Sequence, residues 1–236
     1  IPHMTSSSTI YPIEDRASAV SSPSDTSRTV LNTIGGDKWQ TPGQWVRYTF
    51  TVNSSGMYSI ITRFMQNIND GMYSSRILSV YSGEGLKEGD LGYYNGVPFK
   101  EANELRFNYS TDWQTEALRF GNYGVNAKGK EEMLYTDIEM YFAAGIEYSI
   151  ELEVSLGTMG DIVRQVNTSL AIINDAYLSI MKLTGADPDA NRDYNFLEVM
   201  PETVAHIIIE GRTLRAVATE LTNLAGIKSS TVATLE

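Results

Sequence analysis

Hydrophobic residues recur with two different periods along the chain, and the change falls near Gly157. In the stretch 45–52 every second residue is apolar, so one face of a half-buried antiparallel strand collects them. Those residues are Val46, Tyr48, Phe50 and Val52, and Tyr148, Ile150, Leu152 and Val154 alternate in the same way. Similar short segments, rich in aromatic and β-branched residues, lie between them at 57–66, 76–81, 105–109, 116–120 and 133–142. Strands in this number, without an amphipathic helix between them, predict an antiparallel β-sandwich over residues 5–156.

Beyond Gly157 the apolar residues step by four and three, which is typical of helices packed along their length. One row is Met159, Val163, Val166, Leu170, Ile173, Tyr177 and Ile180, and a second is Met200, Val204, Ile207, Gly211, Leu214, Ala218 and Leu221. Gly185 is placed to stop the first helix, and Pro201 suits the first turn of the second. The pattern therefore predicts a long antiparallel two-helix hairpin over residues 157–228, joined by a turn-rich link at 186–196.

The predicted hairpin has a wider apolar face than one partner helix can cover. Ile162, Ile172, Ile208 and Ile209 lie outside the two rows. The extra surface must meet the sandwich, a third helix or a second copy of the chain, so intramolecular docking and a homodimer are both open. Residues 1–4 and the end of the tail 229–236 read as cloning remnants and are left out of this reasoning.

Composition excludes several classes of partner. A net charge of −11 over 236 residues provides no basic footprint for nucleic acid. The absence of cysteine excludes disulfides, thiolate metal sites and a cysteine nucleophile. No apolar run approaches the roughly 20 residues that span a bilayer, so direct membrane insertion is not expected.

The sequence offers little for catalysis. His206, the one histidine outside the first four residues, lies among apolar neighbours on the predicted second helix. No Ser-His-Asp arrangement can be drawn without it, and no nucleophile elbow or phosphate-binding glycine loop is present. The remaining possibility for an enzyme is a pair of carboxylates that hydrolyses a glycosidic bond. We expect a protein that is not an enzyme.

Aromatic residues beside loops are the more informative signal. The chain has 14 Tyr and 3 Trp. Several of them fall in or next to Gly-, Asn- and Asp-rich connections: Trp39, Tyr73, Tyr81, Tyr93, Tyr94, Trp113 and Tyr123. A sugar ring stacks its apolar face on such side chains, while amide, carboxylate and guanidinium groups bind its hydroxyls. The alternative is that the Trp side chains cover the ends of the sandwich core.

Acidic side chains offer oxygen ligands for calcium. Glu14 and Asp15 lie near the first strand, and Asp70 lies beside Asn67 and Asn69. Calcium takes such ligands, but tight turns use the same residue types. Glu14 and Asp15 are the candidate metal site.

The segments 43–52 and 55–64, which read GQWVRYTFTV and SGMYSIITRF, resemble carbohydrate-binding modules of families 6 and 35. The stretch 143–150, AAGIEYSI, resembles a late strand of those modules, and the similarity covers roughly residues 10–156. It implies a β-jelly roll that binds an oligo- or polysaccharide through loops at one end, often with a structural calcium. It also implies ligand contacts in the loop 66–76 and around two aromatic residues: Gln66, Asn67, Asp70, Tyr73, Arg76, Trp113 and Tyr123. The family's C-terminal acidic calcium ligand has no clear counterpart, because the chain here enters a helix.

The segment 152–185 with Arg192-Asp193-Tyr194 is similar to large extracellular solute-binding proteins of Gram-positive bacteria, in which such a sandwich precedes a helical pair. The resemblance implies a cell-surface protein of sugar uptake. We therefore expect a non-catalytic carbohydrate-binding module. The alternative is a structural module whose hairpin mediates docking or dimerisation and whose sandwich binds no sugar.

Overall fold

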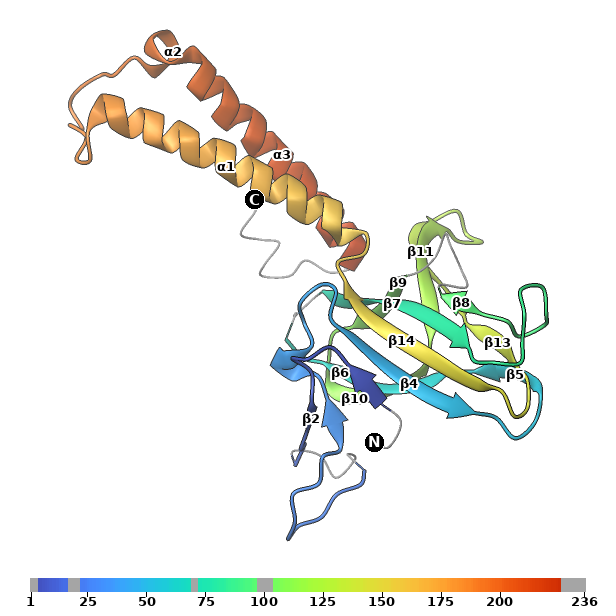
Figure 1. Cartoon of the computed structure of the whole chain (residues 1–236). Helices are drawn as coiled ribbons and strands as arrows, with labels where there is room; N and C mark the ends of the chain where they lie inside the picture. The colour runs from blue at the N-terminus through green and yellow to red at the C-terminus, as the bar shows by residue number, and fades with distance from the viewer. Residues whose placement is uncertain (1–3, 17–21, 69–71, 97–103, 226–236) are drawn as a thin grey trace. The chain divides into compact units, whose positions relative to one another are not determined.

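The computed structural model describes residues 4–16, 22–68, 72–96 and 104–225. The chain divides into two compact units, Ile1–Gly157 and Thr158–Glu236. The first unit is an antiparallel β-sandwich and the second consists of helices (Figure 1). This confirms the predicted fold class, mainly β with a helical part after it.

The first layer of the sandwich is a sheet of eight strands. In spatial order they are β1 (Met4–Ser6), β4 (Trp45–Thr51), β14 (Glu147–Ser155), β7 (Tyr73–Ser82), β9 (Glu104–Asn108), β11 (Arg119–Val125) and β12 (Glu131–Asp137), and β8 (Asn95–Gly96) pairs with β7. All pairings are antiparallel, and β14 lies between β4 and β7, with Tyr148 opposite Phe50 on one side and Ser82 on the other. The sheet includes Met4, opposite Tyr48, although this residue was expected to be a cloning remnant outside the fold.

The second layer is built from four strands. They are β5 (Gly56–Ser59), β6 (Ile61–Gln66), β10 (Ser110–Ala117) and β13 (Glu139–Phe142). The segment 57–66, predicted as one strand, divides at Ile60, because β6 pairs with β10 and β5 pairs with β13. Leu118 bridges the division: its N–H donates to the Ile60 carbonyl at 2.7 Å, and its own carbonyl accepts from Ile138 N–H at 2.9 Å. A separate ribbon pairs β2 (Pro12–Ile13) with β3 (Thr33–Ile34), followed by the short 3₁₀ helix η1 (Gly36–Lys38).

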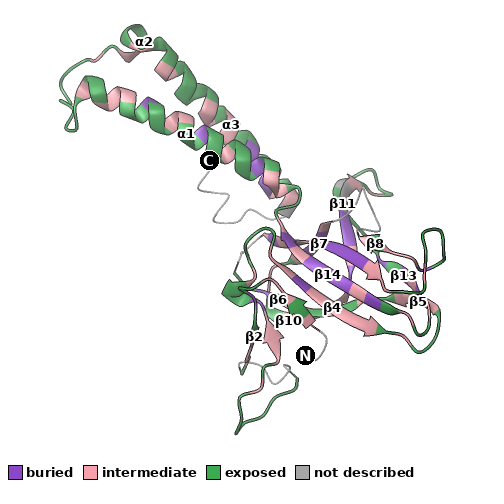
Figure 2. Ribbon diagram, in the orientation of Figure 1, coloured by how far each residue is buried: buried purple, intermediate pink, exposed green. Residues whose placement is uncertain are grey.

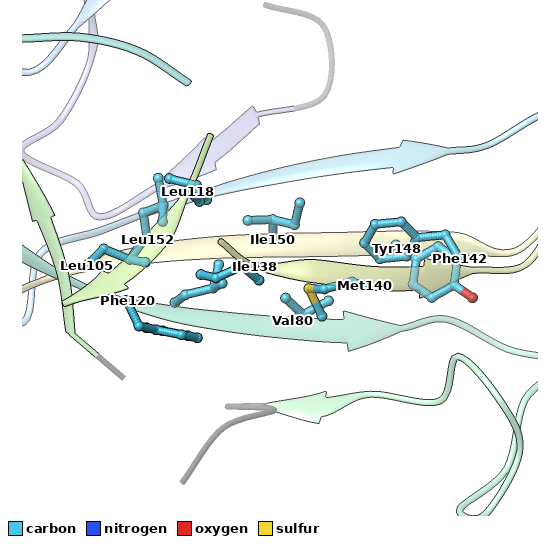
Figure 3. Close-up of a cluster of buried hydrophobic side chains, with 11 residues drawn as sticks. Val80, Leu105, Leu118, Phe120, Ile138, Met140, Phe142, Tyr148, Ile150 and Leu152 are labelled. Carbon is cyan, nitrogen blue, oxygen red and sulfur yellow. The ribbon is translucent and has the colours of Figure 1, made fainter. Parts of the chain in front are cut away.

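The core lies between the two layers and is rich in aromatic rings (Figure 3). Tyr148 of β14 and Phe142 of β13 are almost fully buried, and their ring centroids are 4.7 Å apart. Phe50 meets the Phe142 ring edge-on at 5.2 Å, a favoured geometry for aromatic pairs. The hydroxyl of Tyr148 accepts a hydrogen bond from Ala143 N–H at 3.0 Å, so its polar end is also satisfied.

The second unit contains the two predicted long helices. They are α1 (Met159–Thr184) and α3 (Pro201–Ala225), with the short helix α2 (Phe196–Val199) between them. Gly185 ends α1 in a positive-φ conformation (φ 80°), and its N–H bonds to the Met181 carbonyl. Pro201 begins α3, as predicted. Within the described part of the chain, no helix is both long and apolar enough to span a membrane.

The row of residues predicted to pack α1 against its partner is partly wrong. At every second position the buried residue is the one before the residue predicted. Val163, Leu170 and Tyr177, assigned to the row, are 41%, 50% and 56% exposed. The buried residues of α1 are instead Ile162, Ser169 and Ala176 (Figure 2). The hydroxyl of Ser169 donates to the Glu210 carboxylate of α3 at 2.5 Å. A polar pair and a small alanine therefore occupy the contact, which hydrophobicity alone could not indicate. On α3, Ala218 and Leu221 are buried as predicted.

Substitution of Tyr148 tests the core. Tyr148→Phe leaves Ala143 N–H without its acceptor, so we expect the free energy of unfolding of the sandwich to fall by about 1–3 kcal/mol. Tyr148→Ala should cost about 3–5 kcal/mol because it also leaves a cavity. All three tryptophans lie in the sandwich unit, so tryptophan fluorescence during urea unfolding follows this unit alone. The control Tyr11→Phe changes an exposed ring and should stay within about 0.5 kcal/mol. Equal losses for both Phe variants would contradict this account of the core.

Candidate functional site

An exposed apolar row lies on the outward side of the second layer. Side chains alternate along β5 and β6, so Met57, Ile61 and Met65 point away from the core and are 60%, 68% and 38% exposed. Arg63 shares this side and is also exposed. On β10, Thr115 is the register partner of Arg63 and is exposed with it. We call this surface, with Trp113, the outer face. Apolar side chains gathered in one exposed row are typical of a recognition surface.

Trp113 is the aromatic side chain of the outer face. It lies on β10 two residues before Thr115, and its contact with Arg63 places its ring on the side of that exposed residue. The guanidinium of Arg63 lies 5.8 Å from the centroid of its ring. The pairing of β10 with β6 shifts register between Ser110 and Gln114, a bulge of the kind that redirects side chains. Gln114 steadies this bulge by donating from its amide to the Ser110 hydroxyl at 2.9 Å.

Asp15 fixes the orientation of Trp113 from a distant part of the sequence. The indole Nε1 donates to the Asp15 carboxylate at 3.2 Å. Asp15 follows β2, and its backbone N–H donates to the Asn32 side-chain oxygen at 2.8 Å. The Asn32 amide in turn donates to the carbonyls of Asp15 and Pro23, both at 3.0 Å. Trp113 was predicted to belong to a sugar site and Asp15 to a metal site, and the structure brings the two side chains together.

The outer face combines the groups that a carbohydrate requires. A partly exposed indole ring can stack against the apolar face of a pyranose, while Arg63 can donate to its oxygens. The carboxylate of Asp15 can accept from hydroxyls beside the ring. Because Trp113 is already held by a hydrogen bond, little side-chain freedom is lost on binding. The face is open, which suits a chain of sugars better than a small enclosed molecule.

Two residues of the predicted loop site are buried, which corrects their assignment. Tyr73 is 5% exposed because it belongs to β7, and the Arg106 guanidinium covers its ring at 4.2 Å. Gln66, also buried, donates to the Met72 carbonyl at 3.2 Å and accepts from Ile68 N–H at 3.0 Å. Neither side chain presents a surface on which a sugar could lie. Asn67 is exposed next to Gln66.

Arg76, another predicted ligand contact, makes hydrogen bonds to backbone carbonyls of the sandwich. Its guanidinium donates to the carbonyls of Ser75 at 2.8 Å and of Trp39 at 3.0 Å, and lies 4.5 Å from the centroid of the Trp39 ring. Burial lowers the pKa of Arg76 to about 10. Of the other predicted contacts, Asp70 lies outside the described residues, and Tyr123 is placed by its backbone in β11, opposite Met133.

The candidate metal residues do not fit a calcium ion. One Glu14 carboxylate oxygen accepts from Val30 N–H at 3.1 Å, and the other pairs with Arg16 at 2.8 Å. A cation therefore already occupies the position next to Glu14, while Asp15 accepts from Trp113. Calcium usually takes six to eight oxygen ligands. No group of three or more His, Asp or Glu residues that could hold a metal occurs in the part of the chain that the structure describes.

Two hollows lie elsewhere in the described chain, one of about 10 Å³ in the sandwich and one of about 310 Å³ on the helical unit. A gap of about 10 Å³ between the layers is lined by Arg106, Glu116 and Arg119, and it is no larger than a water molecule requires. An open groove on the helical unit is lined by Ile172, Asp175 and Ser179 of α1 and by Glu202 and His206 of α3.

Comparison with known proteins finds a family match for the second unit only. Residues 161–236 match the family described as "Bacterial solute-binding protein, 4-helix bundle domain". No curated protein matches the sequence. Among solved structures, the chain is similar to a cycloisomaltooligosaccharide glucanotransferase of Paenibacillus sp. complexed with cycloisomaltoheptaose, with 19% identity and a TM-score of 0.30. The match covers 51% of this chain and 12% of that one, and at this level it carries no argument. The family match supports the resemblance of the helical part to solute-binding proteins. The likeness of the sandwich to carbohydrate-binding modules of families 6 and 35 stays a prediction.

Calcium addition tests the metal assignment. Because the oxygens of Glu14 and Asp15 are engaged, we expect the same thermal midpoint with calcium as with a chelator. A site holding calcium at about 100 times its dissociation constant would instead add about 2.7 kcal/mol. Stabilisation by calcium that disappears in Glu14→Gln would contradict this expectation and support the metal site predicted from the sequence. Glu132→Gln, at an exposed position of β12, is the control.

Proposed function

We propose that this chain is a non-catalytic carbohydrate-binding module of a bacterial extracellular or cell-surface protein, and that the outer face binds an oligo- or polysaccharide. The observation that carries the proposal is the fixed geometry around Trp113. An aromatic ring, a carboxylate that holds it at 3.2 Å and a guanidinium 5.8 Å from its centroid come from three segments of the sandwich.

The arrangement indicates how a sugar chain would lie. One pyranose would stack on Trp113, and the carboxylate of Asp15 and the guanidinium of Arg63 would bind its hydroxyls. Further sugar units would follow β6 past Met65 or Ile61, whose exposed side chains provide apolar contact. An open strip of this kind favours a polymer, because each unit adds a small contact area.

The helical unit supports a place in sugar capture or uptake. Its match to a domain of bacterial solute-binding proteins favours a chain that works outside the membrane, where such glycans are met. The alternative function is a structural or assembly module that binds no sugar. The exposed apolar side chains of α1 favour this alternative, since they form a surface suited to another protein.

A glycan array followed by calorimetry with the best ligand tests the proposed function. Trp113→Ala should weaken binding at least about tenfold, because a central aromatic contact usually contributes more than about 1.4 kcal/mol. Arg63→Ala should weaken it less. Tyr177→Ala removes an exposed ring from the helical unit and should leave sugar affinity unchanged.

The possible results distinguish whether the chain binds a glycan from which surface binds it. Absence of binding to any glycan would refute the function. Binding that Trp113→Ala leaves intact would refute the outer face as its location, and near-ultraviolet circular dichroism of the variant would show whether the sandwich remains folded.

A further inference from the structure

Asn32 holds the backbone of Asp15 with both ends of its side-chain amide. The amide oxygen accepts from the Asp15 N–H at 2.8 Å, and the amide nitrogen donates to the Asp15 carbonyl at 3.0 Å. The same nitrogen donates to the Pro23 carbonyl, also at 3.0 Å. A planar group with one acceptor and two donors is needed for all three contacts, which is what an asparagine amide supplies. The backbone on both sides of the Asp15 Cα is thereby fixed.

These contacts are important because the ribbon that carries Asp15 is short. β2 and β3 pair over two residues each, and Pro12 has no backbone N–H to contribute. The pairing ends at Ile13, whose carbonyl accepts from the Asn32 N–H at 3.1 Å. The Asn32 side chain then reaches two residues further along the opposite segment, to Asp15. It therefore extends the ribbon by a side chain where the pairing of the two strands has ended.

A second contact closes the same segment one residue earlier. The Glu14 carboxylate accepts from the Val30 N–H at 3.1 Å. The described residues between the two sides, 22–29, are exposed, as in a surface loop, where the backbone is commonly mobile. The two contacts join residues 14–15 to residues 30–32 at the base of this loop. Asp15 is thus kept in place beside a stretch of chain that would not hold it by packing.

We propose that Asn32 is a positioning residue for glycan binding, which sets the orientation of Trp113 through Asp15. This inference rests on the proposed function of the outer face. The Asn32 amide fixes the backbone of Asp15, and the Asp15 carboxylate accepts from the Trp113 indole at 3.2 Å. The ring on which a sugar would stack is therefore held by a residue that lies two hydrogen bonds away from it.

The consequence for binding is a lower entropic cost. A side chain that is ordered only in the complex loses conformational freedom on binding, and a ring that is already fixed avoids this loss. Without the Asn32 amide, both the Trp113 ring and the Asp15 carboxylate would have to be ordered by the ligand. We expect an affinity about two- to tenfold weaker, which is a smaller loss than removal of the ring itself.

The indole N–H resonances of the ¹⁵N-labelled chain test the positioning directly. Three tryptophans give three signals, and Trp113→Phe identifies the signal of Trp113. Asn32→Ala should shift this signal in the same direction as Asp15→Ala does, because both variants weaken the same hydrogen bond. The signals of Trp39 and Trp45 should stay in place, which shows that the sandwich remains folded. A Trp113 signal that Asn32→Ala leaves unchanged would overturn the proposal.

Thr33→Val is the matched control for loss of a side-chain hydrogen bond in this ribbon. The Thr33 hydroxyl donates to the Ile13 carbonyl at 3.1 Å, one residue along the chain from Asn32. The substitution removes this bond and keeps the shape of the side chain, and it leaves the contacts to Asp15 intact. The Trp113 signal should therefore not move in this variant. A shift as large as that of Asn32→Ala would mean that any loosening of the ribbon has the same effect, and would contradict a specific role for Asn32.

Calorimetry with the best-binding glycan tests the effect on affinity. Asn32→Ala should weaken binding about two- to tenfold, and Thr33→Val should leave it unchanged. When Asp15→Ala is already present, adding Asn32→Ala should cause little further loss, because Asn32 acts through Asp15. Losses that add fully in the double variant would show a separate route and contradict the proposal.

The wild-type chain distinguishes this inference from the proposed function. If the wild-type chain binds no glycan, the proposed function is refuted and the role of Asn32 in binding falls with it. If the wild-type chain binds a glycan and Asn32→Ala binds it equally well, the positioning role alone is refuted.

Discussion

The pairing of β14 with both β4 and β7 is the interaction on which the sandwich depends. Tyr148, Ile150, Leu152 and Val154 of this strand all face the core, while Glu151 points to the other side and pairs with Arg47 at 2.7 Å. A shift of one residue in register would exchange these two sides completely. The buried face of β14 is also the surface on which β13 packs, through Phe142. The second layer, and with it the outer face, is therefore positioned by this strand.

The strands that line the core could be predicted from alternation, because each buries one side in a continuous layer. This holds for β4 and β14, in which Val46 and Tyr148 are fully buried. The division of the segment 57–66 at Ile60 could not be predicted, since it arises from a change of partner strand and not from the segment itself. The ends of α1 and α3 were predictable from Gly185 and Pro201, whose backbone preferences act locally.

The packing of the helices and the site show where sequence reasoning fails. Ser169 is buried because it binds Glu210, a residue far along the chain, and hydrophobicity assigned Leu170 to the contact instead. Tyr73 was predicted to be exposed because it adjoins a loop, whereas its strand turns it inward under Arg106. Asp15 was assigned to a metal site because it is acidic. Its actual hydrogen-bond partner, Trp113, is 98 residues away in sequence and could not be recognised from it. In each case the deciding contact is between distant residues, which a single sequence does not reveal.

Glycan recognition by the sandwich unit is the proposed function. The outer face is the central claim, and hydrogen–deuterium exchange with and without the best-binding glycan tests it most directly. The account predicts slower exchange on binding in β6, in β10 and in the segment around Asp15, with no change in α1 or α3. Protection confined to the eight-stranded sheet or to the helices would contradict it.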